Sequence, residues 1–183
     1  MFKGVFIGDR IMKQERKILI LGESHHWEKS DWDEQERSSE EAEEARRKKL
    51  ENYTTEKVVN NYLNQYNGDG FRDKCYRFFD RIVQSFGIEP DRRNDLWDKV
   101  FFGNYIGGSL CGVGDNKAKN LIAENRNSYN DELFKFIKNY KVDAVFCFSR
   151  RVYNALPNFE KDEKAVNKTQ TIRTGTVGKK TII

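Results

Sequence analysis

A cluster of reactive and stacking side chains directly follows the first strongly apolar run of the chain, beginning after Gly22. It contains an acid, a hydroxyl, two imidazoles and an indole, on Glu23, Ser24, His25, His26 and Trp27. The chain has two histidines and both lie here, so histidine-based acid–base chemistry is confined to this stretch. A carboxylate can orient a water or stabilise a developing positive charge, and an imidazole can donate a proton to a leaving group. The cluster therefore indicates a binding or catalytic site.

Three apolar runs predict the strands that position this site. The run at 17–21 is almost wholly aliphatic and ends at Gly22, as expected of a strand buried on both faces. A similar run at 99–105 ends in Asn104 and Tyr105. Another at 143–148 is followed directly by Ser149, Arg150 and Arg151. In open α/β sheets, ligands bind beyond the carboxyl ends of the strands. We therefore expect the three strand ends to meet at one edge of the sheet.

Helical patterns alternate with these strands. Apolar residues keep helical spacing near 54–66, 71–86, 116–125, 130–140 and 150–156. The pattern predicts an α/β fold, a three-layer α/β/α sandwich with a mainly parallel central sheet and helices on both faces. The apolar stripe of the second helix, from Phe71 to Phe86, is interpreted as core packing. We further expect a short strand at 4–8, a glycine-rich loop at 109–116 and two β segments at 169–173 and 176–183.

Composition indicates one domain of 183 residues with a charged insertion at 30–52, expected to be an exposed helix or a mobile segment. The net charge of +4 permits nucleic-acid binding without requiring it. No apolar run reaches 18 residues, so we expect no membrane span. The three cysteines are isolated, which predicts reduced thiols in a cytoplasmic protein without a metal site or cofactor.

Three segments together resemble the uracil-DNA glycosylase superfamily. The run Gly22-Glu23-Ser24-His25-His26-Trp27 is similar to a first motif found as Gly-Gln-Asp-Pro-Tyr-His or Gly-Glu-Ala-Pro-Gly. The run Phe101-Phe102-Gly103-Asn104 is similar to a later strand whose final asparagine hydrogen-bonds a flipped base. The strand and helix at 144–156 resemble a third family segment that ends in leucine. The resemblance covers the order of elements across most of the chain.

The resemblance implies a divergent glycosylase-like protein that binds a nucleobase, a nucleotide or DNA and hydrolyses an N-glycosidic bond. A flipped base must be gripped on its pairing edge and stacked on a ring. The expected base-binding residues are Gly22, Trp27, Asn104 and Tyr105. The expected catalytic residues are Glu23, Ser24, His25 and His26. Independently of the resemblance, the expected phosphate contacts are Lys117, Lys119, Arg150 and Arg151, and Arg92 and Arg93 join them if the protein is a non-catalytic binding module.

The chain also departs from the family pattern. Its first motif has no proline, and Ser24 stands where several branches carry a water-activating Asp or Asn. No histidine follows His26, so a closing His-Pro-Ser motif is absent. The chain ends on a strand-like run, from which two alternatives follow. Either native sequence continues past Ile183 and supplies such a motif, or the chain is complete and base excision of the usual kind is not expected.

Two other functions are compatible with the same residues. In an SGNH-type esterase, Ser24 would be the nucleophile and Gly103-Asn104 would serve the oxyanion hole, although the C-terminal Asp-x-x-His pair of that group is absent. In a non-catalytic module, the same edge of the sheet would hold a nucleotide or nucleic acid without turnover. Structural roles also remain open, because Asn104 can satisfy backbone groups at a strand end. The sequence alone leaves these alternatives undecided.

Overall fold

The computed structural model describes residues 4–27, 54–64, 76–107, 109–111, 116–157, 161–165, 171–177 and 180–182. Strands are β1 (Phe6–Ile7), β2 (Ile18–Gly22), β3 (His25–Trp27), β4 (Val100–Asn104), β5 (Ser109–Cys111), β6 (Ala144–Cys147), β7 (Lys161–Ala165), β8 (Thr171–Val177) and β9 (Lys180–Ile182). Helices are α2 (Thr55–Asn64), α3 (Arg77–Ser85), α4 (Asn94–Trp97), α5 (Asn116–Tyr140) and α6 (Arg150–Ala155), with 3-10 turns η1 (Ile11–Lys13) and η5 (Pro90–Arg92). The charged segment at 30–52 lies outside the described residues.

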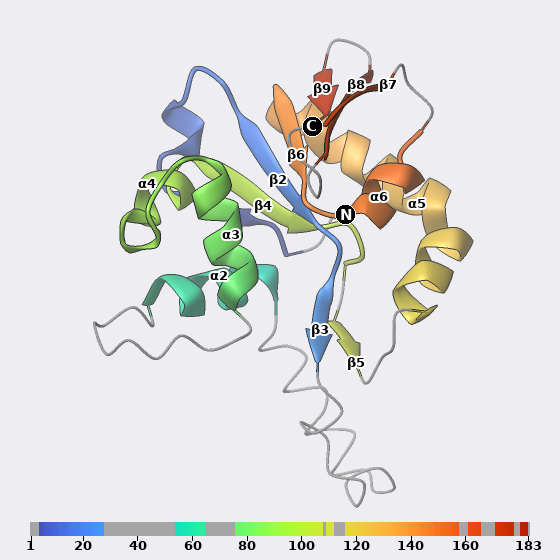
Figure 1. Ribbon diagram of the computed structural model, residues 1–183, viewed down its shortest axis with the longest axis horizontal. Coiled ribbons are helices and arrows are strands. Elements are labelled where there is room, and N and C mark those ends of the chain that lie inside the picture. Colours follow the sequence, from blue (N-terminus) through green and yellow to red (C-terminus); the bar gives the residue numbers. More distant parts are fainter. Residues whose placement is uncertain are drawn as a thin grey trace, which may run out of the picture.

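The main sheet has seven strands in the order β1-β4-β2-β6-β9-β8-β7 (Figure 1). Its four central strands, β4, β2, β6 and β9, are mutually parallel. The outer strands β1, β8 and β7 are antiparallel to their neighbours. The chain is thus an α/β protein with a mixed, mostly parallel open sheet, which confirms the expected fold class at this level.

Helices cover both faces of the sheet, and alternate residues of each strand pack into a different core. On one face, Leu19, Leu21 and Phe101 pack beneath α5 and α6. On the other face, Ile20 and Phe102 pack against α2, α3 and α4. Because each strand is buried on both sides, its sequence is a continuous apolar run rather than an alternation. Figure 1 shows the sheet between these two groups of helices.

Several elements differ from the sequence prediction. The two helices expected at 116–125 and 130–140 are one continuous helix, α5, because the polar stretch between them contains no glycine or proline to end it. Gly175 was expected between two strands and instead lies inside β8, and β7 was not predicted. Pro90, expected in a loop, begins the 3-10 turn η5, where a ring at the first position is compatible with helical backbone.

The expected core stripe of α3 holds with one correction. Phe79, Ile82 and Val83 are buried, and the helix is followed by Gly87 at φ +70°, as a helix-ending glycine requires. Phe78 was assigned to the same stripe, yet its side chain is 38% exposed. The first part of the predicted helix, including Phe71 and Cys75, lies outside the described residues.

Arg93 is a second correction, because it was expected to contact phosphate and is buried instead. Its Nη2 donates to the Leu63 carbonyl at 2.6 Å, and its guanidinium lies 5.4 Å from the centre of the Tyr62 ring. The neighbouring Arg92 is exposed and pairs with Asp95 at 2.7 Å. Arg93 therefore joins α2 to the η5–α4 segment, a role that a pair of adjacent arginines in the sequence does not reveal.

Replacing Arg93 with alanine should lower the free energy of unfolding by roughly 2–4 kcal/mol. The Leu63 carbonyl loses its buried, charged donor, and the Tyr62 ring loses the guanidinium that packs against it. The matched variant Arg92→Ala should change it by less than about 0.5 kcal/mol, as is usual for an exposed ion pair. Urea denaturation of both variants measures the difference. Equal effects of the two substitutions would contradict the buried role of Arg93.

Candidate functional site

Strands β2 and β4 continue together beyond the main sheet. The Tyr105 N–H donates to the Gly22 carbonyl at 3.0 Å, and the Ile106 N–H donates to the Glu23 carbonyl at 2.9 Å. The paired chains then form a second, two-stranded parallel sheet from β3 and β5. The expected turn after Gly22 is therefore extended backbone that leads into a strand, and part of the predicted glycine-rich loop is its partner. Figure 1 shows β3 and β5 projecting from the main sheet.

The order of the central strands creates a switch point beside β2. The first helix described after β2 is α2, which packs on one face of the sheet, whereas α6, which follows β6, packs on the other face. Because β2 and β6 are adjacent and parallel, their carboxyl ends lie together while the following segments diverge. Ligands in open α/β sheets bind at such points. The residues that follow β2 and β6 are therefore the first candidates for a site.

A carboxylate, a hydroxyl and a guanidinium meet at this point. The Ser149 hydroxyl donates to Glu23 Oε2 at 2.7 Å, and Arg151 Nε lies 3.4 Å from the same oxygen. The Glu23 side chain is 13% exposed, so its charge is compensated close at hand rather than mainly by water. Ser149 also caps α6 by accepting a hydrogen bond from the Val152 N–H at 3.3 Å. These contacts fix the carboxylate between β2 and α6.

Asn104 ends β4 beside Gly22, its partner in the parallel register. The residue is 5% exposed, and its Nδ2 is buried without a hydrogen-bond partner among the described residues. A β-carbon at Gly22 would overlap the Asn104 carboxamide oxygen and lie 3.3 Å from Phe102 Cζ. Glycine is therefore required at position 22, because the amide of Asn104 occupies the space of a side chain.

The carboxamide and the carboxylate approach Gly22 from opposite faces of the sheet. Asn104 shares the face of Phe102, which packs with α3, whereas Glu23 contacts residues at the start of α6. The sequence-based expectation that three strand ends meet at one edge is supported by these pairings. Ser149, which sequence reasoning placed at the edge without a role, could have been recognised from its N-cap position.

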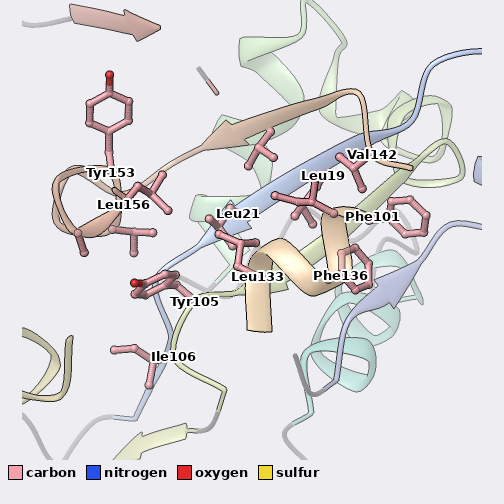
Figure 2. Close-up of a cluster of buried hydrophobic side chains, with 14 of the residues drawn as sticks. Leu19, Leu21, Phe101, Tyr105, Ile106, Leu133, Phe136, Val142, Tyr153 and Leu156 are labelled. Carbon is pink, nitrogen blue, oxygen red and sulfur yellow. The ribbon is translucent and has the colours of Figure 1, made fainter. Parts of the chain in front are cut away.

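Tyr105 was expected to stack on a base, and its burial corrects that prediction. The ring is 1% exposed and packs in the cluster with Leu21 and Leu133, as Figure 2 shows. Its hydroxyl donates to Asn130 Oδ1 at 2.8 Å. Burial raises the pKa of Tyr105 to about 12. Tyr105 therefore ties β4 to α5 and presents no face to a ligand.

The other predicted residues fall into three groups. Ser24 is half-buried, and Lys119 and Arg150 are exposed. The side chains of His25, His26, Trp27 and Lys117 lie outside the described part of the structure.

Burial raises the pKa of the Cys147 thiol to about 12, so this group stays neutral near pH 7 and is no thiolate nucleophile.

No family model matches the chain, and no curated protein matches it. Within the described ranges, no three or more His, Cys, Asp or Glu side chains are grouped so that they could hold a metal ion. Across those same ranges, none of the helices has the length and apolar character needed to cross a membrane. The functional argument therefore depends on the geometry at the carboxyl ends of β2, β4 and β6.

Replacing Gly22 with alanine should lower the free energy of unfolding by roughly 1–3 kcal/mol, the usual cost of overfilling a packed site. In an Asn104→Ala background the same substitution should cost markedly less, because the overlapping carboxamide is gone. Urea unfolding of the two single variants and the double variant gives the coupling. Gly107→Ala is the control, since no heavy atom lies within 4 Å of its β-carbon position. Additive effects would contradict the contact.

Tyr105→Phe should lower the unfolding free energy at pH 8 by about 1–2 kcal/mol, because Asn130 loses its buried donor. The folded pKa of Tyr105 is raised from 10.0 to about 12, so its favourable contribution is complete below pH 10 and is lost as the pH rises through 12. The gap between wild type and variant should therefore narrow over that range. A pH series of urea unfolding measures it, and a constant gap would refute the assignment.

Proposed function

We propose that this chain binds a nucleobase, within DNA or a nucleotide, at the carboxyl ends of β2 and β4, and hydrolyses its N-glycosidic bond. The observation that carries the proposal is the buried Asn104 amide, whose nitrogen has no partner among the described residues. An uncompensated buried amide costs about 1–3 kcal/mol. A ligand acceptor at that nitrogen would recover this cost, so the free protein is prepared for a polar ligand.

The chemistry of a carboxamide suits the pairing edge of a base. An asparagine side chain offers a donor and an acceptor side by side, which matches the O4 and N3–H groups of uracil. Gly22 supports the arrangement because its missing side chain leaves room for the amide. The resemblance to uracil-DNA glycosylases adds support, since an asparagine at the end of a strand has this task there. A glycosylase-like fold is part of the proposal and agrees with the observed α/β architecture.

Glu23 is the carboxylate proposed for the reaction. A water attacks C1′ of the sugar, the C1′–N bond breaks with its electron pair going to the base, and the water's proton is finally transferred to the base. A fixed carboxylate can orient that water and stabilise the positive charge on the sugar. The hydrogen bond from Ser149 and the contact with Arg151 hold Glu23 in one position. His25 or His26 is the proposed donor to the departing base, by the resemblance alone.

Phosphate contacts are assigned to exposed cations near the same elements. Arg150 is exposed at the start of α6, and Lys119 is exposed in the first turns of α5. Arg151 already contacts Glu23, so its guanidinium is only partly available to a phosphate. The net charge of +4 is compatible with a nucleic-acid partner. A cytoplasmic location remains a prediction.

A binding module without turnover is the second candidate. One observation favours it, namely that Oε2 of Glu23 is contacted by both Ser149 and Arg151 and so also has a structural role. In this case Asn104 would hold the base, and Glu23 would only connect β2 to α6. The esterase hypothesis with Ser24 as nucleophile remains a prediction that no described contact favours.

Incubation with single-stranded and duplex oligonucleotides containing one deoxyuridine, followed by alkaline cleavage, tests the proposed reaction. We expect abasic product from the wild type and a loss of at least about 100-fold for Glu23→Gln, because general-base catalysis typically contributes that much. Binding without product in every substrate would favour the binding module instead.

Asn104→Ala tests recognition separately from chemistry. Loss of the amide should weaken oligonucleotide binding by about 5- to 150-fold, the effect of an unmade polar contact of ~1–3 kcal/mol. Asn127→Ala, at an exposed position of α5, is the matched control and should bind as the wild type does. Fluorescence anisotropy at fixed salt measures both. Unchanged binding by Asn104→Ala would refute the role assigned to the amide.

A further inference from the structure

The short helix α6 is held by side-chain contacts at both of its ends. It has six residues, Arg150–Ala155, and a helix of that length is not stable by itself in water. At its start, a hydroxyl and a guanidinium contact Glu23. At its end, the carbonyls of Ala155 and Leu156 accept hydrogen bonds from side chains of α5. The placement of α6 therefore depends on the side chains that bind these two carbonyls.

Arg126 of α5 binds both carbonyls at once. Its Nε donates to the Ala155 carbonyl at 2.6 Å, and its Nη2 donates to the Leu156 carbonyl at 3.1 Å. Donors fixed in one planar guanidinium hold two acceptors in a defined orientation, which a single donor cannot do. The cation also lies at the carboxyl end of α6, where a positive charge is favourable. Arg126 therefore fixes both the position and the direction of the last turn of α6.

Asn130, one turn further along α5, connects the same carbonyl to the end of β4. Its Nδ2 donates to the Ala155 carbonyl at 3.2 Å, and its Oδ1 accepts from the Tyr105 hydroxyl at 2.8 Å. Tyr105 directly follows Asn104 in the chain. One segment of α5 thus contacts both the residue after the buried carboxamide and the helix whose start contacts the carboxylate. The two polar groups lie on opposite faces of the sheet, and this segment holds them relative to each other.

We propose that Arg126 is a positioning residue for the reaction, because through α6 it sets where Ser149 and Arg151 meet Glu23. This inference rests on the proposed function and extends it to a side chain that acts through α6 rather than on the substrate. Ser149 is the physical link, since it accepts a hydrogen bond from the Val152 N–H of α6 and donates to Oε2 of Glu23. A shift of α6 would move both partners of the carboxylate together. A misplacement of about 1 Å can cost about 100-fold in rate, even when its cause is far from the reacting atoms.

Steady-state kinetics on the deoxyuridine oligonucleotide test the assignment. Arg126→Ala should lower kcat about 10- to 100-fold and leave KM within about twofold, because the carboxylate is displaced while Asn104 still binds the base. Arg126→Lys should recover part of the lost kcat, since an ammonium can donate to the same carbonyls without the fixed geometry of a guanidinium. Lys135→Ala, which removes an exposed cation from the same helix, is the matched control and should behave as the wild type does.

A double-variant cycle tests the link through α6 without any reaction. Urea unfolding is compared for Arg126→Ala, for Glu23→Gln and for the double variant. We expect their effects on the unfolding equilibrium constant to depart from independence by at least about twofold, because both substitutions loosen the same helix. The reference pair is Lys135→Ala with Glu23→Gln, whose effects should combine independently. Independent effects of Arg126→Ala and Glu23→Gln would contradict the link.

The outcomes separate this inference from the proposed function. A wild-type kcat in folded Arg126→Ala, or a loss confined to KM, would overturn the positioning role and leave the proposed reaction in place. No abasic product from the wild type would overturn the proposed hydrolysis and the positioning role with it. If Arg126→Ala does not fold, Arg126→Lys decides, because a lowered kcat at constant KM supports the role and a wild-type kcat contradicts it.

Discussion

Hydrogen bonding of β2 on both of its sides is the constraint on which the rest of the structure depends. Ile18 to Leu21 pair with β4 on one edge and with β6 on the other, and all three strands run in the same direction. A parallel pair cannot be closed by a tight turn, so each connection must cross a face of the sheet. The crossovers fill opposite faces, which leaves the carboxyl ends of β2, β4 and β6 together at one edge. Every polar group of the candidate site is positioned by these three ends.

The two polar side chains beside Gly22 are held by different contacts. Glu23 receives a hydroxyl and a guanidinium from α6, so its burial also stabilises the junction between β2 and that helix. The Asn104 nitrogen is buried without such a partner in the described part of the chain. A folded protein that needed only stability would be better served by an apolar residue there. The uncompensated amide is the observation on which the proposed ligand binding rests.

Strongly apolar runs made the central strands predictable, because a strand buried on both faces has no polar positions to confuse its pattern. The proximity of Gly22, Asn104 and the residues after β6 followed from parallel strands alone. The burial of individual rings and cations could not be predicted in this way. Tyr105 and Arg93 are buried by contacts with α5 and α2, which are distant from them in sequence. The pairing of β3 with β5 could not be predicted either, because a strand of three residues is too short to show the alternation of apolar and polar residues that marks a strand. The exposure of Phe78 could not be predicted for a similar reason. Helical spacing assigned Phe78 to the buried face of α3, but its exposure depends on where that helix face reaches the end of the sheet.

The two faces of the sheet divide the proposed ligand between them. Asn104 lies with α3 on one face, whereas Glu23, Ser149 and Arg151 lie toward α6 on the other. In the proposed function, the base is bound on the α3 side of the sheet and the carboxylate acts from the α6 side. Gly22 lies between these two groups, and glycine is needed there because the Asn104 carboxamide occupies the space that a side chain would fill.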